Sequence, residues 1–251
     1  MSGLGDPISR RLVVTCHPLG MAGGFDPDPL LTQHWGVHIL GYDRPGYAAS
    51  DPWPEGEAPS VARWADDVGT AVESDLREAA EKAPAAYRDT IGVLGWGGGG
   101  AFAIALAARL GARVDRLVIV ETPSPRRLAS LAVAERDDPA IEIGDDPATL
   151  RRRQHAIDAA DEQGAAGRIA DARALLPRDW AAGMRGIDAE TLLVHRRDPL
   201  SSGEADSRWF RRHLRHARAV LTNSDRPIID HWHRVLEHLA PDHGEIPERL
   251  R

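Results

Sequence analysis

Apolar and polar positions along the chain follow two different periods, which indicate alternating strands and helices. Short apolar runs rich in β-branched residues predict buried strands. They lie at 11–16, 37–40, 91–94, 116–120, 191–195 and 217–221. Between them, apolar residues recur three and four positions apart, as in the stretch from Val61 to Leu76, for which Ser60 is a plausible N-cap. This alternation predicts an α/β fold of about six parallel strands with helical crossovers.

The stretch 122–187 departs from this alternation, because it is rich in charge and alanine and has no strand pattern. Asp146 followed by Pro147 predicts the start of a helix that runs to Ala160. A second short helix is expected at 167–176, and one long final helix at 228–239. We therefore expect a core made of 1–121 and 188–251, with 122–187 inserted as a small helical cap.

A glycine-rich turn joins the strand at 91–94 to the helix at 101–110, and four of its glycines are consecutive, at 97–100. Two kinds of site use such a turn. The spacing Gly95-x-Gly97-x-x-Gly100 fits a dinucleotide-binding fingerprint, for which Glu121 would be the ribose-binding acid. The same glycines fit a nucleophile elbow in which Gly97 occupies the position of the nucleophile. The turn alone does not separate these alternatives.

Four segments resemble motifs of the α/β-hydrolase superfamily, and together they span most of the chain, from about residue 11 to 240. His17-Pro-Leu-Gly20 resembles its oxyanion loop, and Asp43-Arg-Pro-Gly-Tyr-Ala-Ala-Ser50 resembles its Asp-Arg-Pro-Gly stretch. The segment 94–100 resembles the elbow, and 192–198 resembles the strand and loop that carry the triad acid. A dinucleotide-binding dehydrogenase has no reason to carry the first two. The resemblance implies an α/β-hydrolase fold in which the usual first two antiparallel strands are trimmed.

The resemblance fails at two of the three triad positions. A triad needs a nucleophilic oxygen, an imidazole that accepts its proton and an acid that orients the imidazole. Gly97 has no side chain, and the position of the family's histidine corresponds to Ser224-Asp225. Only Asp198 matches. The chain is therefore similar to a degenerate member of the superfamily, without the serine and the histidine.

Candidate catalytic positions follow from what is left of this pattern. The backbone amides of Leu19 and Gly98 would form an oxyanion hole, since that geometry needs no serine side chain. Asp198 and Asp225 would face each other in the space of the missing imidazole and share a proton. The alternative is that Asp225 is a solvated loop residue or caps the last helix.

Several further side chains are candidates for lining a ligand pocket, although each also has a structural interpretation. His17 braces the oxyanion loop in the alternative interpretation, Asp43 forms a structural ion pair, and the tryptophans belong to the core. The candidates are His17, Trp96, Asp43, Trp180 and His231. No set of residues has metal-ligand spacing, so we expect no metal and no cofactor.

Composition narrows the choice of partners. The formal net charge of −7 argues against non-specific binding to nucleic acid or to an anionic membrane. Cys16 is the one cysteine, no apolar run is long enough to span a bilayer, and residues 1–10 lack the apolar centre of a signal peptide. We therefore expect a cytoplasmic protein whose partner is a small molecule, and we leave a homodimer open.

Three functions remain as hypotheses. The first is a non-hydrolytic enzyme that rearranges, cyclises or eliminates a small, largely apolar carbonyl compound at the oxyanion amides. The second is a catalytically dead pseudo-hydrolase that binds a ligand or partner in its pocket. The third is a residual hydrolase that uses activated water.

Overall fold

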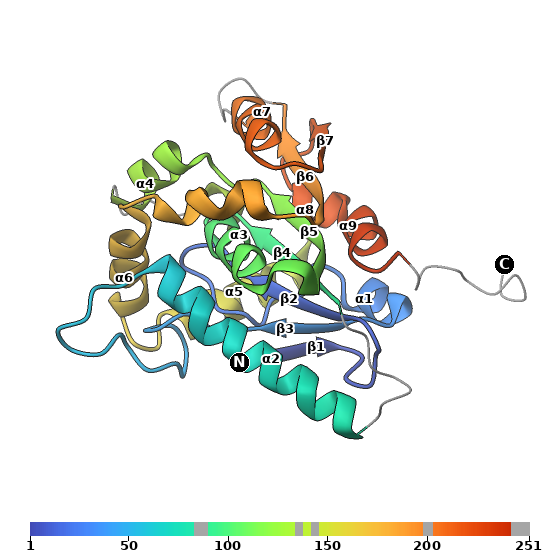
Figure 1. Cartoon of the computed structure of the whole chain (residues 1–251), viewed down its shortest axis with the longest axis horizontal. Helices are drawn as coiled ribbons and strands as arrows, with labels where there is room; N and C mark the ends of the chain where they lie inside the picture. Colours follow the sequence, from blue (N-terminus) through green and yellow to red (C-terminus); the bar gives the residue numbers. More distant parts are fainter. Residues whose placement is uncertain (83–89, 134–137, 142–145, 198–202, 242–251) are drawn as a thin grey trace, which may run out of the picture.

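A single twisted sheet forms the centre of the molecule in the computed structural model, which describes residues 1–82, 90–133, 138–141, 146–197 and 203–241 (Figure 1). The strand order is β1-β3-β2-β4-β5-β6-β7, and every neighbouring pair is parallel except β1 with β3. The strands are β1 (Ser2–Gly5), β2 (Leu12–Cys16), β3 (His38–Gly41), β4 (Ile91–Trp96), β5 (Val114–Val120), β6 (Glu190–Arg196) and β7 (Ala217–Thr222). The predicted α/β fold and its six parallel strands are confirmed.

Strand β1 is an addition to the prediction, which took the antiparallel strands as trimmed. Ser2 pairs with Gly41 and Gly5 with His38, so the first residues add one antiparallel strand to the edge of the sheet. The segment Ser-Gly-Leu-Gly has no β-branched residue and therefore no strand signal of its own. Pairing with the free edge of β3 determines its conformation.

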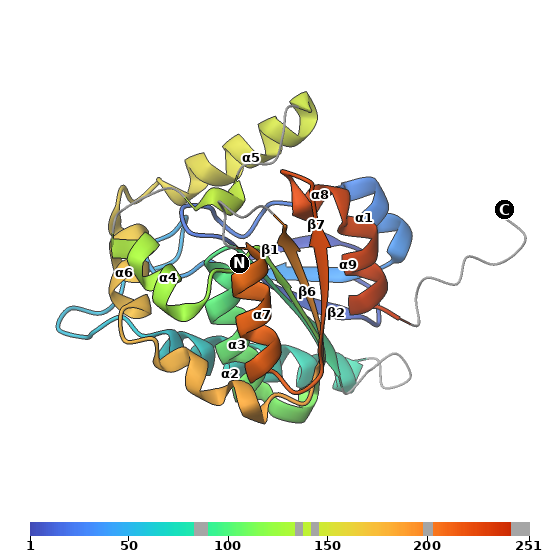
Figure 2. The ribbon, with the colours of Figure 1, turned by 90° about the horizontal axis from the view of Figure 1, so that it is seen from above.

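Helices cover both faces of the sheet (Figure 2). The helices α2, α3 and α7 lie on one face together with the 3₁₀ segment η4, and α1 and α9 lie on the other. The helices are α1 (Pro29–Trp35), α2 (Val61–Lys82), α3 (Gly99–Leu110), α4 (Pro125–Val133), α5 (Pro147–Ala160), α6 (Ala166–Leu175), α7 (Gly203–His213), α8 (Pro227–Asp230) and α9 (Trp232–Leu239); the 3₁₀ segments are η2 (Gly111–Arg113), η3 (Pro139–Ile141) and η4 (Asp179–Gly186). Among the described residues, no helix combines the length and the apolarity that crossing a bilayer requires.

Side chains of the central strands β2, β4, β5 and β6 alternate between two core clusters, one on each face of the sheet. On β4, Val93 belongs to the cluster with α2 and α3, and Leu94 belongs to the cluster with α1 and α9. Because both faces are covered, the strands are nearly continuous apolar runs, as parallel strands in α/β proteins are. This double burial also explains why the strands were easy to find in the sequence.

Two helix boundaries show where local sequence signals succeed and fail. Asp146 accepts a hydrogen bond from the amide of Thr149 at 2.8 Å and Pro147 is the first helical residue, so the predicted start of α5 is confirmed. The predicted final helix is interrupted at His231, which has φ −110° and ψ 12°. Its apolar face nevertheless continues across the break, since Ile228 and Trp232 are both buried.

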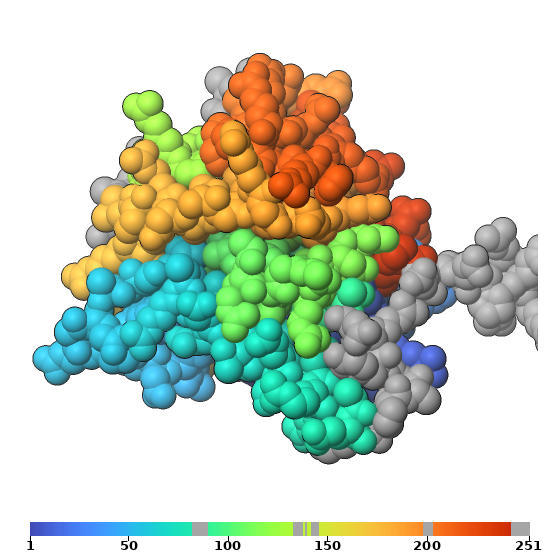
Figure 3. All heavy atoms as spheres, in the orientation of Figure 1, coloured from blue at the N-terminus to red at the C-terminus, as the bar shows by residue number. Residues whose placement is uncertain are grey.

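The described part of the predicted cap, between β5 and β6, contains helices and no strand. Helix α4 packs against α6, whereas η4 packs against α3 and buries Trp180 and Met184 in the main core cluster. Figure 3 shows the η4 segment lying between the α3 and α7 segments on this face of the molecule. The η4 segment at the end of the predicted cap therefore packs into the main core. The boundaries of a separate cap stay a prediction.

Candidate functional site

The sharp turn between β4 and α3 provides the centre of the candidate site. Gly97 has φ +55°, and its amide donates to the carbonyl of Val120 at the end of β5 at 2.9 Å. Gly98 follows as the N-cap residue of α3. A positive φ is accessible to glycine without the steric penalty that other residues meet. The chain therefore makes the strand–turn–helix unit that the glycine run predicted, and the turn lies at the carboxyl end of the sheet.

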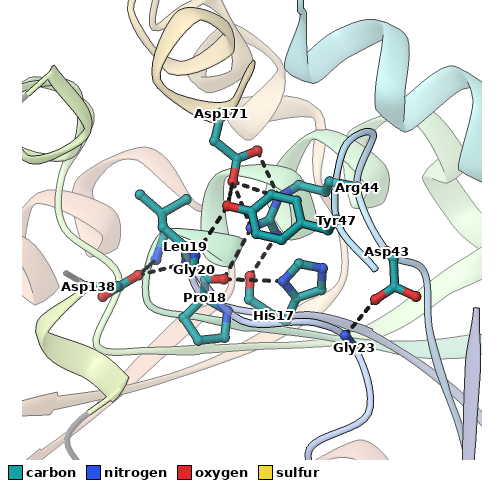
Figure 4. Close-up of polar contacts among 11 residues, drawn as sticks. His17, Pro18, Leu19, Gly20, Gly23, Asp43, Arg44, Tyr47, Asp138 and Asp171 are labelled. Atoms are coloured by element: carbon teal, nitrogen blue, oxygen red, sulfur yellow. Dashed lines mark hydrogen bonds and ion pairs between the residues drawn. The ribbon is translucent and has the colours of Figure 1, made fainter. Parts of the chain in front are cut away.

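A buried carboxylate lies directly on this turn. Asp138, next to η3, is 5% exposed. Its Oδ2 accepts from the amide of Gly98 at 2.6 Å and from the amide of Leu19 at 3.2 Å, and its Oδ1 accepts from Ala140 at 3.1 Å. Figure 4 shows Asp138 pointing toward the oxyanion loop from a different side than Asp171. The two amides predicted for the oxyanion hole thus converge on one oxygen atom, which belongs to the protein itself.

Missing side chains on the turn leave the room that this carboxylate occupies. A Cβ atom on Gly97 would lie 2.4 Å from Oδ2 of Asp138, and one on Gly98 would lie 2.4 Å from Cγ of Leu19. Real Cβ atoms essentially never approach heavy atoms this closely. A serine at position 97 and the observed Asp138 position are therefore incompatible without a rearrangement.

The charge of Asp138 is held in an environment with little water. Burial raises the pKa of this carboxyl, whereas the hydrogen bonds from Gly98, Ala140 and Leu19 and the charge of Arg44 oppose the rise. A carboxylate at two converging amides, one of them at the start of a helix, is a favourable arrangement for an anion. The site therefore suits a carboxylate or a polarised carbonyl oxygen.

Arg44 fixes the direction of the Leu19 amide from behind. Its Nη1 donates to the carbonyl of His17 at 2.7 Å and its Nη2 to the carbonyl of Pro18 at 3.1 Å. The Pro18 carbonyl and the Leu19 N–H belong to one planar trans peptide, so they point in opposite directions. Because Arg44 holds the carbonyl, the N–H is turned toward Asp138.

A buried ion pair in turn holds Arg44 (Figure 4). Arg44 donates from Nε and Nη2 to the carboxylate of Asp171 on α6, at 2.9 Å and 2.8 Å. The hydroxyl of Tyr47 also donates to Asp171 Oδ2, at 2.7 Å, and accepts from the amide of Gly20 at 3.2 Å. Two residues of the Asp-Arg-Pro-Gly motif therefore connect α6 to the oxyanion loop.

His17 is part of the same loop and has a structural environment. Its Nδ1 lies 3.1 Å from the Pro18 carbonyl, and its ring meets the Tyr47 ring edge-on, with centroids 5.4 Å apart. Burial and the nearby Arg44 charge hold the pKa of His17 well below its ordinary value, so the ring is neutral. These contacts support the interpretation of His17 as a brace of the loop.

The other candidate lining residues lie in different surroundings. Asp43 accepts from the amide of Gly23 at 2.7 Å and pairs with the N-terminal amine at 3.2 Å. Trp96 is buried against Phe25, with ring centroids 5.3 Å apart, whereas Trp180 belongs to the core cluster on the opposite face of the sheet. His231 is partly buried at the junction of α8 and α9, where burial and Arg234 lower its pKa.

Of the two carboxyl groups in the predicted acid pair, Asp198 and Asp225, the structure describes only that of Asp225. Asp225 is exposed in the loop between β7 and α8, a position that suits the solvated-loop interpretation. Asp198 lies outside the described residues. A shared proton between these two carboxyls stays a prediction. Among the described residues there is no group of three or more histidine, cysteine, aspartate or glutamate side chains that could hold a metal ion.

Two aspartates of the site escaped sequence reasoning. Asp138 follows other charged residues in a stretch without periodicity, and Asp171 looks like an ordinary polar residue of a helix. Asp138 reaches partners 40 and 119 residues away, and Asp171 reaches Arg44 across 127 residues. The motifs did identify Arg44 and the amides at the start of the helix. Both kinds of group favour a carboxylate partner, and this was the one signal in the sequence for the two aspartates.

Comparisons with known proteins give the fold. No family model and no curated protein sequence matches this chain. Solved structures do match, among them an enol-lactonase from Burkholderia xenovorans LB400, with TM-score 0.66, 18% identity and coverage of 94% of this chain and 92% of that one. MenH from S. aureus matches with TM-score 0.64, 13% identity and coverage of 96% and 97%. An esterase from Exiguobacterium antarcticum matches with TM-score 0.62, 18% identity and coverage of 95% and 92%. These neighbours are α/β-hydrolase-fold enzymes, and this chain has the same fold, as the motifs implied.

A side chain at position 97 should conflict with Asp138. We expect Gly97→Ala to lower the free energy of unfolding by more than Gly36→Ala or Gly111→Ala, which share its φ (57° and 56°) but have nothing within 4 Å of the added Cβ. A side chain at a positive φ costs roughly 1–3 kcal/mol by itself, and the two controls sample different values of ψ, 47° at Gly36 and −127° at Gly111. In an Asp138→Ala background the excess cost of Gly97→Ala should disappear, with a coupling of at least about 0.5 kcal/mol in denaturant unfolding. Strict additivity would contradict the contact.

The buried ion pair should matter far more than a surface pair. We expect Asp171→Asn to destabilise the protein by about 3–5 kcal/mol, because it leaves the Arg44 guanidinium buried without its counter-charge. Asp188→Asn removes an exposed partner of Arg215, a pair 3.0 Å apart, and should cost about 0–1 kcal/mol. Denaturant unfolding of both variants gives the comparison, and equal losses would show that the buried pair has no special role.

Proposed function

We propose that this α/β-hydrolase-fold chain is a non-catalytic binding protein that holds an oxygen atom of a small ligand at the amides of Leu19 and Gly98. One observation at the turn carries the proposal. The nucleophile position is Gly97, and the buried Asp138 carboxylate fills the space above it and accepts hydrogen bonds from both amides. The proposal concerns binding at the place where relatives with a triad perform acyl transfer.

Acyl transfer by a triad needs a hydroxyl nucleophile with an imidazole beside it, and the described residues supply neither at this turn. Gly97 offers no hydroxyl, and the loop that corresponds to the family's histidine carries the exposed Asp225. An ester carbonyl would also have to displace Asp138 before it could use the amides. What survives is the part of the machinery that depends on the backbone, and that part binds oxygen atoms without reacting with them.

A non-hydrolytic enzyme is the second candidate, and the environment of Asp138 favours it. Burial raises the pKa of this carboxyl, as is typical of groups that exchange protons with a substrate. A carbonyl oxygen that took the amides would leave the carboxylate beside the α-carbon. The Asp138 carboxylate would then abstract a proton from the α-carbon, and the amides would stabilise the enolate oxygen.

Serine-directed reagents and ester substrates test the loss of hydrolysis. We expect no fluorophosphonate adduct by intact-mass analysis and no turnover of p-nitrophenyl acetate above the rate in buffer, because position 97 has no hydroxyl. A serine hydrolase with an intact triad serves as the positive control for both reagents. A stoichiometric adduct on a serine, or ester turnover that saturates with substrate, would contradict the binding proposal.

Proton exchange separates the binding protein from the enzyme. We expect the protein not to accelerate exchange of the α-protons of 2-butanone in D₂O, followed by NMR. If Asp138 were a base, the wild type would accelerate the exchange and Asp138→Asn would abolish it, since the amide is nearly isosteric but does not accept the proton. That outcome would replace the binding proposal by the second candidate.

A further inference from the structure

We infer that the Leu19 and Gly98 amides form a carboxylate site that Asp138 occupies as an internal ligand, and that the site takes a small monocarboxylate when Asp138 leaves it. The inference rests on the proposed function, because it names the ligand class of the same amides. It adds that the free ligand competes with a side chain of the protein.

The permanent part of this site consists of two amides from different elements. Gly98 lies at the start of α3, a helix of 12 residues, and Leu19 lies in the loop after β2. The third donor to the carboxylate, Ala140, follows Asp138 by two residues and therefore belongs to the occupant's own segment. An external carboxylate would keep the first two hydrogen bonds and replace the third by water or by its own groups.

The occupant identifies the chemistry of the site. A buried carboxylate is costly unless its oxygens are hydrogen-bonded, and here both oxygens accept backbone amides. The two core amides converge on the same oxygen, at 2.6 Å and 3.2 Å, which is the arrangement that a single anionic oxygen requires. Arg44 lies behind the Leu19 peptide and contributes positive charge without touching the carboxylate.

The geometry limits the size of what can bind. The Oδ2 atom lies where any side chain on Gly97 would begin, 2.4 Å from the position that a Cβ on that residue would take. Removing the Asp138 carboxylate therefore empties a space that matches one carboxylate group above a bare glycine. Formate is the smallest probe of that space, since it is the carboxylate of Asp138 without the side chain that carries it.

Asp138 competes with any added carboxylate for the two amides, so its removal should raise the affinity for that carboxylate. Asp138 is present at a high effective concentration, because its backbone holds it next to the amides. The apparent Kd of an added carboxylate is its intrinsic Kd divided by the fraction of molecules in which Asp138 has left the site. We therefore expect formate to bind Asp138→Ala more than about tenfold more tightly than it binds the wild type.

Chemical rescue by formate provides the test. Asp138→Ala should have a lower melting temperature than the wild type, and sodium formate should restore it along a saturating curve, compared with equal concentrations of sodium chloride. In ¹⁵N-labelled Asp138→Ala, the amide signals of Leu19 and Gly98 should shift with the same midpoint. Wild type should show no saturable response over the same range.

Matched variants make the rescue specific. Asp146→Ala also removes a carboxylate that accepts a backbone amide, Thr149 at 2.8 Å, but this carboxylate is exposed, so formate should not rescue it. Adding Gly97→Ala to Asp138→Ala should abolish the response to formate, because the new Cβ fills the space. Asp138→Asn should also fail to respond, since its amide oxygen still reaches the two donors.

Asp138→Ser protects the test against a variant that does not fold. Its hydroxyl can bond the Ala140 amide as an ST-turn does, but it is too short to reach the other two amides. A saturable response of either variant, lost with Gly97→Ala, supports the site. A response no larger than that to chloride in both variants overturns it. Saturable ester turnover by the wild type would overturn the proposed function and leave the carboxylate site standing, so the two failures are distinguishable.

Discussion

The buried pair of Arg44 and Asp171 is the interaction on which the geometry of the site depends. The Arg44 side chain is 1% exposed, and its guanidinium bonds a carboxylate of α6 on one side and two carbonyls of the oxyanion loop on the other. A buried charge of this kind is stable only when all its partners are in place. The pair therefore couples α6 to the peptide that presents the Leu19 amide, and through that amide to Asp138.

The glycine at position 97 and the carboxylate of Asp138 explain each other. A nucleophile elbow normally forces its side chain into a sparsely populated backbone region, and Gly97 with φ +55° carries no such strain. The same lack of a side chain admits the carboxylate to within hydrogen-bonding distance of the Gly98 amide. Without an acceptor, the buried Gly98 amide would be unsatisfied, at a cost of about 1–3 kcal/mol, and the partly buried Leu19 amide would lose its partner as well. Asp138 meets that requirement from within the chain.

The sequence predicted the parts of this molecule that follow a local period or a local motif. The buried strands, the helix start at Pro147 and the turn at Gly97 all depend on neighbouring residues, so a reader of the sequence can find them. Strand β1 depends on pairing with β3, and the positions of Asp138 and Asp171 depend on contacts across 40 to 127 residues. No local pattern encodes such contacts, which is why the most informative residue of the site was missed.

Backbone geometry alone is enough to direct the two amides of the site toward one oxygen atom. The direction of the Gly98 amide is set by the start of α3, and that of the Leu19 amide is set by Arg44 behind its peptide. Neither direction depends on a serine or histidine side chain, so the two donors converge without one, the Gly98 amide buried and the Leu19 amide partly buried. Donors of this kind require an acceptor whatever the fate of catalysis. This chain, which shares its fold with an esterase at 18% identity, therefore presents two converging amides and fills them with a carboxylate of its own.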